Sequence, residues 1–256
     1  MLMNVIGLDS GSTTTKGVLF AQNKLVKKCL VSTSGDPIRA AEQVITELDE
    51  NKQYQVVATG YGRKLLNADK AVTEITCHAK GAAYLSEGIQ NVIDIGGQDS
   101  KVIRMDTKGH VLDFNMNDKC AAGTGRFVEV LMRTLGEEIE HIDSFVASAE
   151  PIKINSMCTV FAESEVISLI GRGEKREDIA LGVLHSIAAR ISNQHRQINP
   201  EQGPIFFSGG LSHSKKVTEL VAEYTKKEVY YDQELSQYAG AIGAALIGMQ
   251  QKNFFC

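Results

Sequence analysis

The hydrophobic positions of this 256-residue chain alternate between the spacing of helices and the spacing of strands. Apolar residues at helical spacing predict helices at 37–51, 74–86, 126–135, 162–170, 176–194, 214–224 and 238–249. Short apolar runs that end at glycine, proline or polar turns predict strands at 55–59, 204–208 and 228–231, besides those of an internal repeat. Strands interleaved with helices indicate an α/β protein with mixed sheets.

The internal repeat organises the first half of the chain. Residues 5–20 and residues 92–105 each read as a buried strand, an Asp-x-Gly turn and a second strand, followed by a polar turn and a third short strand. A repeat of this length predicts two lobes of similar fold that face each other, rather than a short-period solenoid. One constant offset aligns Asp9 with Asp94, Gly11 with Gly96, and Lys16 with Lys101.

Composition and charge exclude several classes of function. The chain is 43% hydrophobic and 23% charged, which is typical of a globular protein with a sizeable core. Its formal net charge is −4 and it has no basic stripe, so we expect no nucleic-acid partner. The sequence has no apolar run of the roughly 18 residues that a membrane helix needs, and its N-terminus does not resemble a secretory signal. We therefore expect a cytoplasmic protein without a membrane partner.

The turn of the first repeat copy has the residues of a phosphate-binding loop. Gly11 lets the backbone approach an anion, and N–H groups and hydroxyls beside it can cradle phosphate oxygens. A lysine at the end of the turn adds a compact positive charge. The spacing is not that of a Walker A loop. An ordinary hairpin turn is the alternative, which the second copy makes the weaker account. The predicted nucleotide contacts are Ser12, Thr13, Thr14, Thr15 and Lys16.

The second turn, at residues 94–99, repeats this form with more carboxylate. Asp9 and Asp94, if they face each other, suit a hydrated Mg²⁺ ion, which retains several waters and takes few protein ligands. Gln98 can orient a water against the γ-phosphate, as glutamines do in other nucleotide hydrolases. For Lys101, a solvated strand residue is the alternative to a role in the site. The catalytic candidates are Asp9, Asp94, Gln98 and Asp99, with backbone contacts at Gly96 and Gly97.

A third element is the strand at 204–208, which ends in Gly209 and Gly210. Such paired glycines let an adenosine lie against the backbone, although a simple turn is the alternative. The helix face at 239–245 consists of small residues, which permit close packing between lobes, with ordinary tight helix packing as the alternative. With the repeat, these features resemble the acetate kinase, sugar kinase, heat-shock chaperone and actin superfamily. The resemblance implies one α/β ATPase unit, with ATP between two duplicated lobes. The expected limits are 1–256 for the unit, roughly 1–90 plus 238–250 for lobe I, and roughly 91–237 for lobe II.

Two of the five cysteines each precede a predicted helix by a few residues. Cys120 lies in the run 117–127 and Cys158 in the run 155–166. A helix N-terminus stabilises negative charge, which favours the thiolate that binds metal. A cubane iron–sulfur cluster needs about four thiolates, so two per chain make half a site that a two-fold dimer would complete. The spacing alone leaves open that both thiols are buried as small hydrophobes.

Longer motifs narrow the resemblance to a family. The run Asn-Asp-Lys-Cys-Ala-Ala-Gly-Thr-Gly-Arg-Phe around Cys120 resembles a signature of 2-hydroxyacyl-CoA dehydratase activators, and so does Cys-Thr-Val-Phe-Ala-Glu-Ser-Glu-Val from Cys158. These activators belong to the wider group of benzoyl-CoA reductase ATPase subunits. The resemblance extends from end to end, and in the loop 235–240 it makes Gln237 a nucleotide contact, with a plain helix-entry residue as the alternative.

This resemblance implies a homodimer that holds one 4Fe-4S cluster between its subunits, with Cys120 and Cys158 of each subunit as the ligands. ATP or ADP and Mg²⁺ are the other expected cofactors. ATP hydrolysis would drive one low-potential electron onto a partner, a 2-hydroxyacyl-CoA dehydratase or a related double-cubane iron–sulfur protein. Ferredoxin or flavodoxin is the expected electron donor. We do not expect Cys29, Cys77 or Cys256 to be ligands.

Two other functions fit the nucleotide motifs. A small-molecule kinase of the same fold would need a carboxylate base, for which Asp99 or Asp118 could serve, but 256 residues leave little room for a substrate lid. A nucleotide-switched module without redox chemistry would keep its cysteines in the core.

Overall fold

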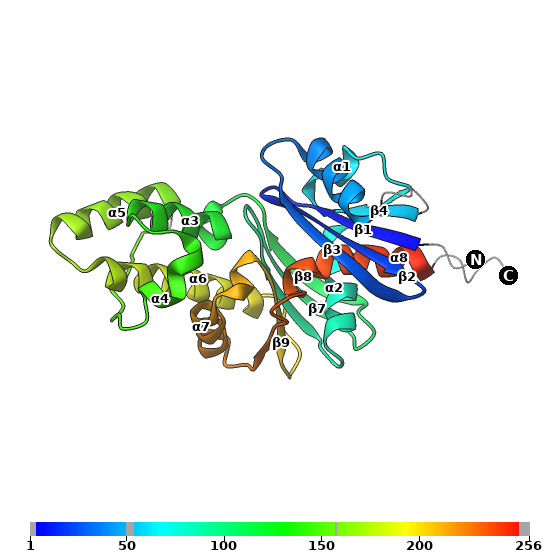
Figure 1. The fold of residues 1–256 in the computed structure, drawn as a ribbon. Coiled ribbons are helices and arrows are strands. Elements are labelled where there is room, and N and C mark those ends of the chain that lie inside the picture. The colour runs from blue at the N-terminus through cyan, green and yellow to red at the C-terminus, as the bar shows by residue number, and fades with distance from the viewer. Residues whose placement is uncertain (1–3, 50–53, 157, 251–256) are drawn as a thin grey trace. The chain divides into compact units, whose positions relative to one another are not determined.

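The computed structural model describes residues 4–49, 54–156 and 158–250, in which strands and helices alternate along the chain (Figure 1). The strands are β1 (Asn4–Ser10), β2 (Thr14–Ala21), β3 (Lys24–Ser32), β4 (Tyr54–Thr59), β5 (Lys70–Ala71), β6 (Asn91–Ile95), β7 (Ser100–Met105), β8 (Val111–Asn117), β9 (Ile205–Gly209) and β10 (Val229–Tyr230). The α-helices are α1 (Pro37–Leu48), α2 (Glu74–Leu85), α3 (Gly125–Thr134), α4 (Ile142–Phe145), α5 (Thr159–Gly171), α6 (Arg176–Arg196), α7 (Lys215–Thr225) and α8 (Ala239–Gln250).

The strands form two five-stranded sheets, in the orders β3-β2-β1-β4-β5 and β10-β9-β6-β7-β8. Contacts within the chain separate two compact units. The first consists of the residues up to Val92, Ile103–Phe114, and those from Asp232 onward, and the second of Ile93–Val102 and Asn115–Tyr231. The lobe limits expected from the repeat stay a prediction.

The first sheet is mixed and is covered on both faces. Its central strand β1 is antiparallel to β2 and parallel to β4, and every β1 residue after Asn4 is buried. A Cβ at Gly7 would collide with the backbone of α8, and a Cβ at Gly17 would collide with Val44 of α1. The two helices therefore pack directly against the sheet, and this close packing explains why β1 is apolar almost throughout.

The second unit contains the largest group of buried apolar side chains. They come from β6, β7 and β9 and from the helices α3, α5, α6 and α7. Phe127 of α3 and Phe207 of β9 are among those fully removed from solvent. This core fixes the positions of α6 and of the two helices that follow Cys120 and Cys158, α3 and α5.

The predicted helices and strands occur in the structure, with differences at their ends. Helix α1 ends at Leu48 rather than at 51, where the Asp49 N–H donates to the Ile45 carbonyl, and residues 50–53 lie outside the described part. The third strand of the first repeat copy was expected to be short, but β3 pairs with β2 over Lys24–Ser32. The lysines of β3 interrupt the apolar pattern by which a strand is recognised in the sequence. An exposed edge strand tolerates such charges, whereas a buried strand does not.

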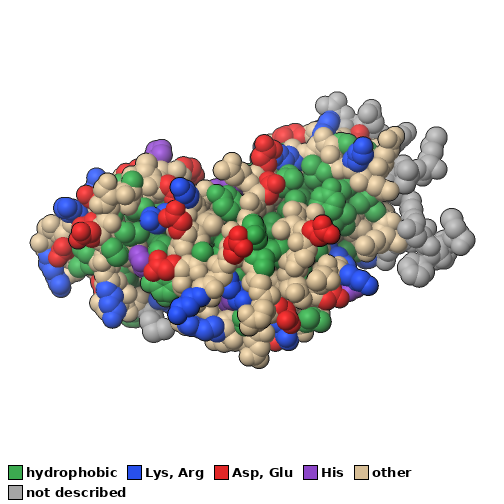
Figure 2. All heavy atoms as spheres, turned by 90° about the horizontal axis from the view of Figure 1, so that it is seen from below, with side chains coloured by type: hydrophobic (Ala, Val, Ile, Leu, Met, Phe, Trp, Pro, Cys, Tyr) green, Lys and Arg blue, Asp and Glu red, His purple; other side chains and the backbone are tan. Residues whose placement is uncertain are grey.

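The surface of the described residues carries charges of both signs. On the face shown in Figure 2, Lys and Arg side chains are interspersed with Asp and Glu side chains. Among the described helices, none combines the length and the apolar character needed to cross a membrane.

Candidate active site

The first predicted turn connects β1 to β2 in the first unit. Asp9 lies opposite Lys16 in the hairpin register, and residues 11–13 form the connection between the strands. A Cβ at Gly11 would lie 2.8 Å from the Thr14 carbonyl oxygen and 3.9 Å from Lys16 Nζ. The lysine amine is therefore close to the turn, where it can add its charge to the backbone N–H groups.

Thr15 differs from the other hydroxyl residues of this turn. It is buried, and its Oγ1 lies 3.0 Å from Thr33 Oγ1, which in turn donates to the Gly11 carbonyl at 2.8 Å. These bonds give the Thr15 side chain a role in holding the turn. Ser12, Thr13 and Thr14 are partly or fully exposed. Phosphate contacts of all four residues stay a prediction.

The Asp9 carboxylate is enclosed by two glycines of the same unit. A Cβ at Gly60 would lie 2.6 Å from Asp9 Oδ1, and a Cβ at Gly240 would lie 2.6 Å from Oδ2 and 3.1 Å from His78 Nε2. Any larger residue at either glycine would displace the carboxylate. Asp9 is only 6% exposed, so its carboxylate has little freedom to move, and its service to a hydrated cation stays a prediction. The sequence did not indicate the part of Gly60, His78 and Gly240 in this arrangement.

The second turn, in the second unit, is built around a buried lysine. Lys101 Nζ lies 3.2 Å from Asp94 Oδ2 and 2.6 Å from Asp99 Oδ2. Ser208 Oγ donates to Asp94 Oδ1 at 2.7 Å. Lys101 and Asp94 are each 3% exposed, so the alternative of a solvated strand lysine is wrong. The physical reason is that an ammonium beside two carboxylates can be buried where an unpaired one cannot.

The tip of this turn is open to solvent. The Gly96 N–H donates to the Asp99 carbonyl at 2.9 Å, and a Cβ at Gly96 would collide with the Asp99 carboxylate. Gln98 is exposed beside the half-buried Gly97, and its role in orienting an attacking water stays a prediction.

The paired glycines end β9 beside β6. Gly209 has φ of 89°, and a Cβ there would collide with the Ile95 backbone, so only glycine fits. A Cβ at Gly210 would meet nothing within 4 Å, which leaves open space at this backbone. In the first unit, Gln237 is half-buried in the turn Ser236–Tyr238 that leads into α8. Nucleotide contacts of these three residues stay a prediction.

The second turn is bonded directly to the start of α3. The Gly125 N–H donates to the Gly96 carbonyl at 2.8 Å, and the Arg126 N–H donates to the Gly97 carbonyl at 2.9 Å. A displacement of this turn would therefore act on the first turn of α3, which the Cys120 segment immediately precedes.

Cys120 and Cys158 are both exposed, so the alternative that both are core residues is wrong. Cys120 precedes the short helical turn Ala121–Gly123, which leads into α3. Asn117 fixes the Cys120 backbone, because its Oδ1 accepts from the Cys120 N–H at 3.1 Å and its Nδ2 donates to the Cys120 carbonyl at 2.7 Å. Cys158 immediately precedes α5. Cys29 and Cys77 are buried, and Cys256 lies outside the described residues.

Glu165 of α5 binds the segment before Cys158. Its carboxylate accepts from the Asn155 N–H at 3.0 Å and from the Ser156 N–H at 2.8 Å. Burial alone would raise the pKa of Glu165, but the hydrogen bonds from Ser156 and Asn155 outweigh it and lower that pKa. A charged Glu165 thus fixes the approach to Cys158.

The donor set at these helix starts suits iron better than magnesium, because exposed thiols are soft ligands. Among the residues that the structure describes, no group of three or more His, Cys, Asp or Glu could hold a metal ion. Two thiols from one chain therefore fit a four-thiolate cluster only when a second chain supplies the other two.

A model of the BadF/BadG/BcrA/BcrD ATPase family matches residues 6–248. The chain belongs to this family. An activator of lactoyl-CoA dehydratase from Anaerotignum propionicum is 40% identical over 254 residues, which cover 95% of this chain and 96% of that protein. The predicted family and the enzyme class, an ATPase, are confirmed.

Two solved structures of the family are similar over nearly all of the chain. Component A of (R)-2-hydroxyglutaryl-CoA dehydratase from Acidaminococcus fermentans gives a TM-score of 0.90 at 35% identity, covering 98% of this chain and 99% of that one. The activator of 2-hydroxyisocaproyl-CoA dehydratase from Clostridium difficile, with bound ADPNP, gives 0.89 at 36% identity, covering 98% and 96%. A ROK hexokinase from Thermus thermophilus, 14% identical with a TM-score of 0.53 and covering 98% and 100%, shares the fold alone. The predicted superfamily fold with its two lobes is confirmed.

Proposed function

We propose that this protein is an ATP-hydrolysing one-electron reductase that activates a partner iron–sulfur enzyme. The observation that carries the proposal is the pair of exposed thiols, Cys120 and Cys158, at two helix starts of a family ATPase. The partner class is a 2-hydroxyacyl-CoA dehydratase or a related double-cubane protein, as the names of three relatives support. Ferredoxin or flavodoxin in the cytoplasm is the proposed electron donor.

In this proposal, the turns at residues 11–16 and 94–99 bind the nucleotide phosphates and hydrolyse ATP. Backbone N–H groups and hydroxyls of residues 11–16 would bind phosphate oxygens, and the enclosed Asp9 and Asp94 would hold waters of Mg²⁺. Gln98, exposed at the tip of its turn, would orient the attacking water. Lys101 holds the Asp94 and Asp99 carboxylates in place through its two ion pairs. The peptide groups of Gly209 and Gly210 would lie against the adenosine.

Hydrogen bonds within the second unit give a physical route from the nucleotide turn to the cysteines. The Gly96 and Gly97 carbonyls accept from the start of α3. Gln194 of α6 is hydrogen-bonded to Ser100, the residue after Asp99. Its Oε1 accepts from Ser100 Oγ at 3.0 Å, and its Nε2 donates to the Ser100 carbonyl at 3.2 Å. Two helices are thus fixed to the turn that would sense the γ-phosphate. Coupling requires that these elements have two arrangements that the nucleotide biases.

A 4Fe-4S cluster held by four thiolates, when bound, would supply one electron at low potential. The chain's part is to provide two thiols and a surface that a second copy can cover. Val160 and Phe161, in the first turn of the helix that follows Cys158, are each 67% exposed, and Ile167 on the same helix is 57% exposed. Apolar side chains of this size beside a half-site support a homodimer that buries them at the two-fold axis.

The test is made on protein purified without oxygen, by iron and sulfide content, native mass and the visible spectrum. We expect about two irons and two sulfides per chain in a dimer, with broad thiolate-to-iron absorption. Cys120→Ala and Cys158→Ala should lose the colour. Cys29→Ala is the matched control, because Cys29 is buried and donates to Glu47 Oε2 at 2.9 Å, and it should stay brown.

A colourless wild-type protein that cannot be reconstituted with iron and sulfide would contradict the proposal. ATP turnover that then depends on a small-molecule acceptor would indicate the kinase, and nucleotide binding with little turnover would indicate the switch. Colour that persists in both cysteine variants would show that the ligand assignment is wrong.

A further inference from the structure

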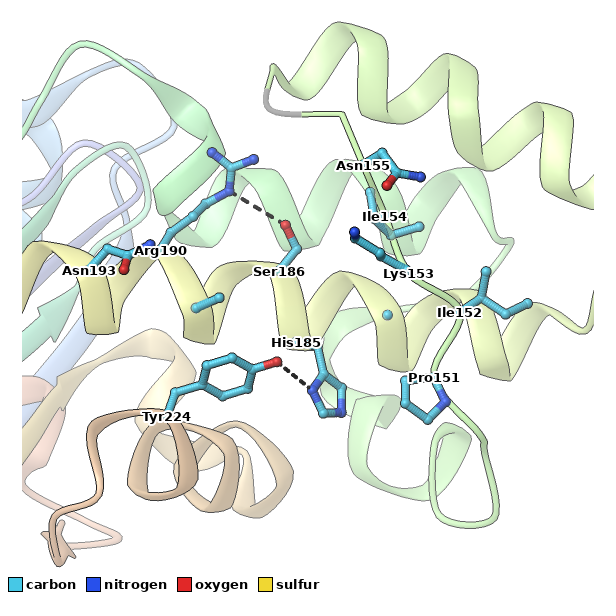
Figure 3. A pocket seen from close by; sticks show the side chains of 12 residues that line it. Pro151, Ile152, Lys153, Ile154, Asn155, His185, Ser186, Arg190, Asn193 and Tyr224 are labelled. Carbon is cyan, nitrogen blue, oxygen red and sulfur yellow. Dashed lines mark hydrogen bonds between the residues drawn. The ribbon is translucent and has the colours of Figure 1, made fainter.

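Arg190, near the C-terminal end of α6, lies between the two cysteine segments. Figure 3 shows its side chain rising from α6 on the side of residues 153–155, with Nε directed at the hydroxyl of Ser186. It belongs to the lining of an open groove of about 430 Å³ between α6 and residues 151–155. The side chain is only partly exposed to solvent.

The guanidinium contacts both segments at once. Nη2 donates to the Ser156 carbonyl at 3.2 Å, two residues before Cys158. The guanidinium carbon lies 5.6 Å from the ring centroid of Phe127, which belongs to the helix that follows Cys120. A planar guanidinium can stack on an aromatic ring and donate in its own plane together, which an ammonium cannot do.

The same peptide group is therefore held from two sides. The Ser156 N–H donates to Glu165 of α5, and the Ser156 carbonyl accepts from Arg190 of α6. One positively charged side chain, Arg190 of α6, therefore contacts both the segment before Cys158, which leads into α5, and the first turn of α3, the helix after Cys120.

The charge of Arg190 has no carboxylate partner among the ion pairs that join described residues. The side chain is partly withdrawn from water, and such a cation without a carboxylate is unfavourable unless another anion compensates it. The contacts to Ser156 and Phe127 place the guanidinium beside the two cysteine segments, where a group held by the two thiols would supply that anion.

We propose that Arg190 is a positioning residue that acts as the counter-charge and brace of the group held by Cys120 and Cys158, and that it raises the reduction potential of that group. The inference rests on the proposed function. A fixed cation near a redox centre favours the state with the additional electron, so it makes the centre easier to reduce. Arg190 would in this way keep the site reducible by a donor protein.

The experiment compares homodimers of wild type, Arg190→Met, Arg190→Lys and the control Arg172→Met, all purified and reconstituted without oxygen. Arg172 is exposed at the end of α5 opposite to Cys158, so its replacement removes the same charge far from the thiols. The readouts are iron per chain, the rate of iron loss to a chelator, and the reduction potential followed by absorbance and electron paramagnetic resonance.

We expect Arg190→Met to show a more negative potential and a roughly 10-fold faster loss of iron, as for other residues that support metal ligands. Arg190→Lys keeps the charge, so its potential should stay near that of wild type although iron is lost faster. Arg172→Met should match wild type in both.

An unchanged potential and iron content in Arg190→Met would overturn the inference while leaving the proposed function intact. Equal potential shifts in Arg190→Met and Arg190→Lys would overturn the counter-charge, because the effect would then follow shape rather than charge. A wild-type protein without a cluster would overturn the proposed function and this inference together. If Arg190→Met does not fold, the Arg190→Lys result decides between charge and shape.

Discussion

The buried lysine of the second turn shows how one residue determines the state of its neighbours. Lys101 lies within 3.2 Å of Asp94 and 2.6 Å of Asp99, and its side chain is 4% exposed. Its ammonium forms an ion pair with each carboxylate, so the charges of the three side chains compensate one another at this turn. Removal of one partner from such a group is costly, because the remaining charges lose their compensation.

We predict that Lys101→Met lowers the free energy of unfolding by about 3 kcal/mol and abolishes ATP hydrolysis. Urea unfolding and phosphate release measure the two effects. Lys215→Met is the matched control: its side chain is 79% exposed and its Nζ lies 3.9 Å from Glu219, so we expect a change within about 0.5 kcal/mol. Unfolding of Lys101→Met at the wild-type urea concentration would show that the buried pair adds nothing.

The second prediction concerns His195, which makes stability depend on pH. Burial, and to a lesser degree the charge of Lys227, lowers the pKa of His195 to about 4 from an ordinary value of 6.5. Its Nε2 is buried without a hydrogen-bond partner. Between these two pKa values the unfolded chain binds a proton that the folded chain does not, so stability falls as the pH decreases from about 6.5 to 4.

Through His195, the free energy of unfolding should be about 2 kcal/mol lower at pH 5 than at pH 7.5. In His195→Gln, the decrease in unfolding free energy between pH 7.5 and pH 5 should be smaller by this amount. The pKa of His185 is also lowered, first by burial, so part of the slope should remain. The exposed His141 provides the control variant His141→Gln, and an equal slope in wild type and His195→Gln would contradict the prediction.

At the scale of elements, small residues allow α2, α8 and β1 to pack at backbone contact. A Cβ at Gly243 would collide with the Cys77 backbone of α2, and one at Gly81 would collide with the Ala239 backbone of α8. The small-residue face of the last helix was predicted, and the structure shows that it packs within the first unit. This packing places Gly240 beside the Asp9 carboxylate, so the same helix serves stability and the site.

We predict that Gly243→Ala lowers the free energy of unfolding by roughly 3 kcal/mol, because a backbone contact cannot yield to an added methyl group. Gly171→Ala is the control, since a Cβ at Gly171 meets nothing within 4 Å. Denaturant midpoints at constant pH measure both variants. Similar midpoints for the two would mean that α8 moves away from α2 at little cost.

At the scale of the whole molecule, the residues proposed for nucleotide binding differ from those proposed for thiol ligation. The turn residues Asp9 and Asp94 are buried, whereas Cys120 and Cys158 are exposed at helix starts. Hydrogen bonds from Gly125 and Arg126 connect the second turn to α3 without passing through a thiol. The two proposed properties should therefore be separable by mutation.

We predict that the double variant Cys120→Ala with Cys158→Ala, although without iron, still binds a non-hydrolysable ATP analogue with Mg²⁺. At an analogue concentration of about 100 times its dissociation constant, the free energy of unfolding should rise by about 2.7 kcal/mol. Calorimetric titration and thermal unfolding measure this. An analogue that fails to stabilise the double variant, but stabilises wild type, would mean that the nucleotide site forms only in the loaded protein.

The sequence by itself determined the repeat, the two Asp-x-Gly turns, the helices and the paired cysteines, because these depend on local spacing and on residue chemistry. It did not determine burial. Tertiary structure decided that Lys101 is enclosed, that Cys120 and Cys158 are exposed, and that Arg190 joins their segments. Such features depend on contacts between distant parts of the chain, as between Ser208 and Asp94, which are 114 positions apart. Whether a charged side chain is solvated or paired follows from what packs against it, and only the folded chain fixes that.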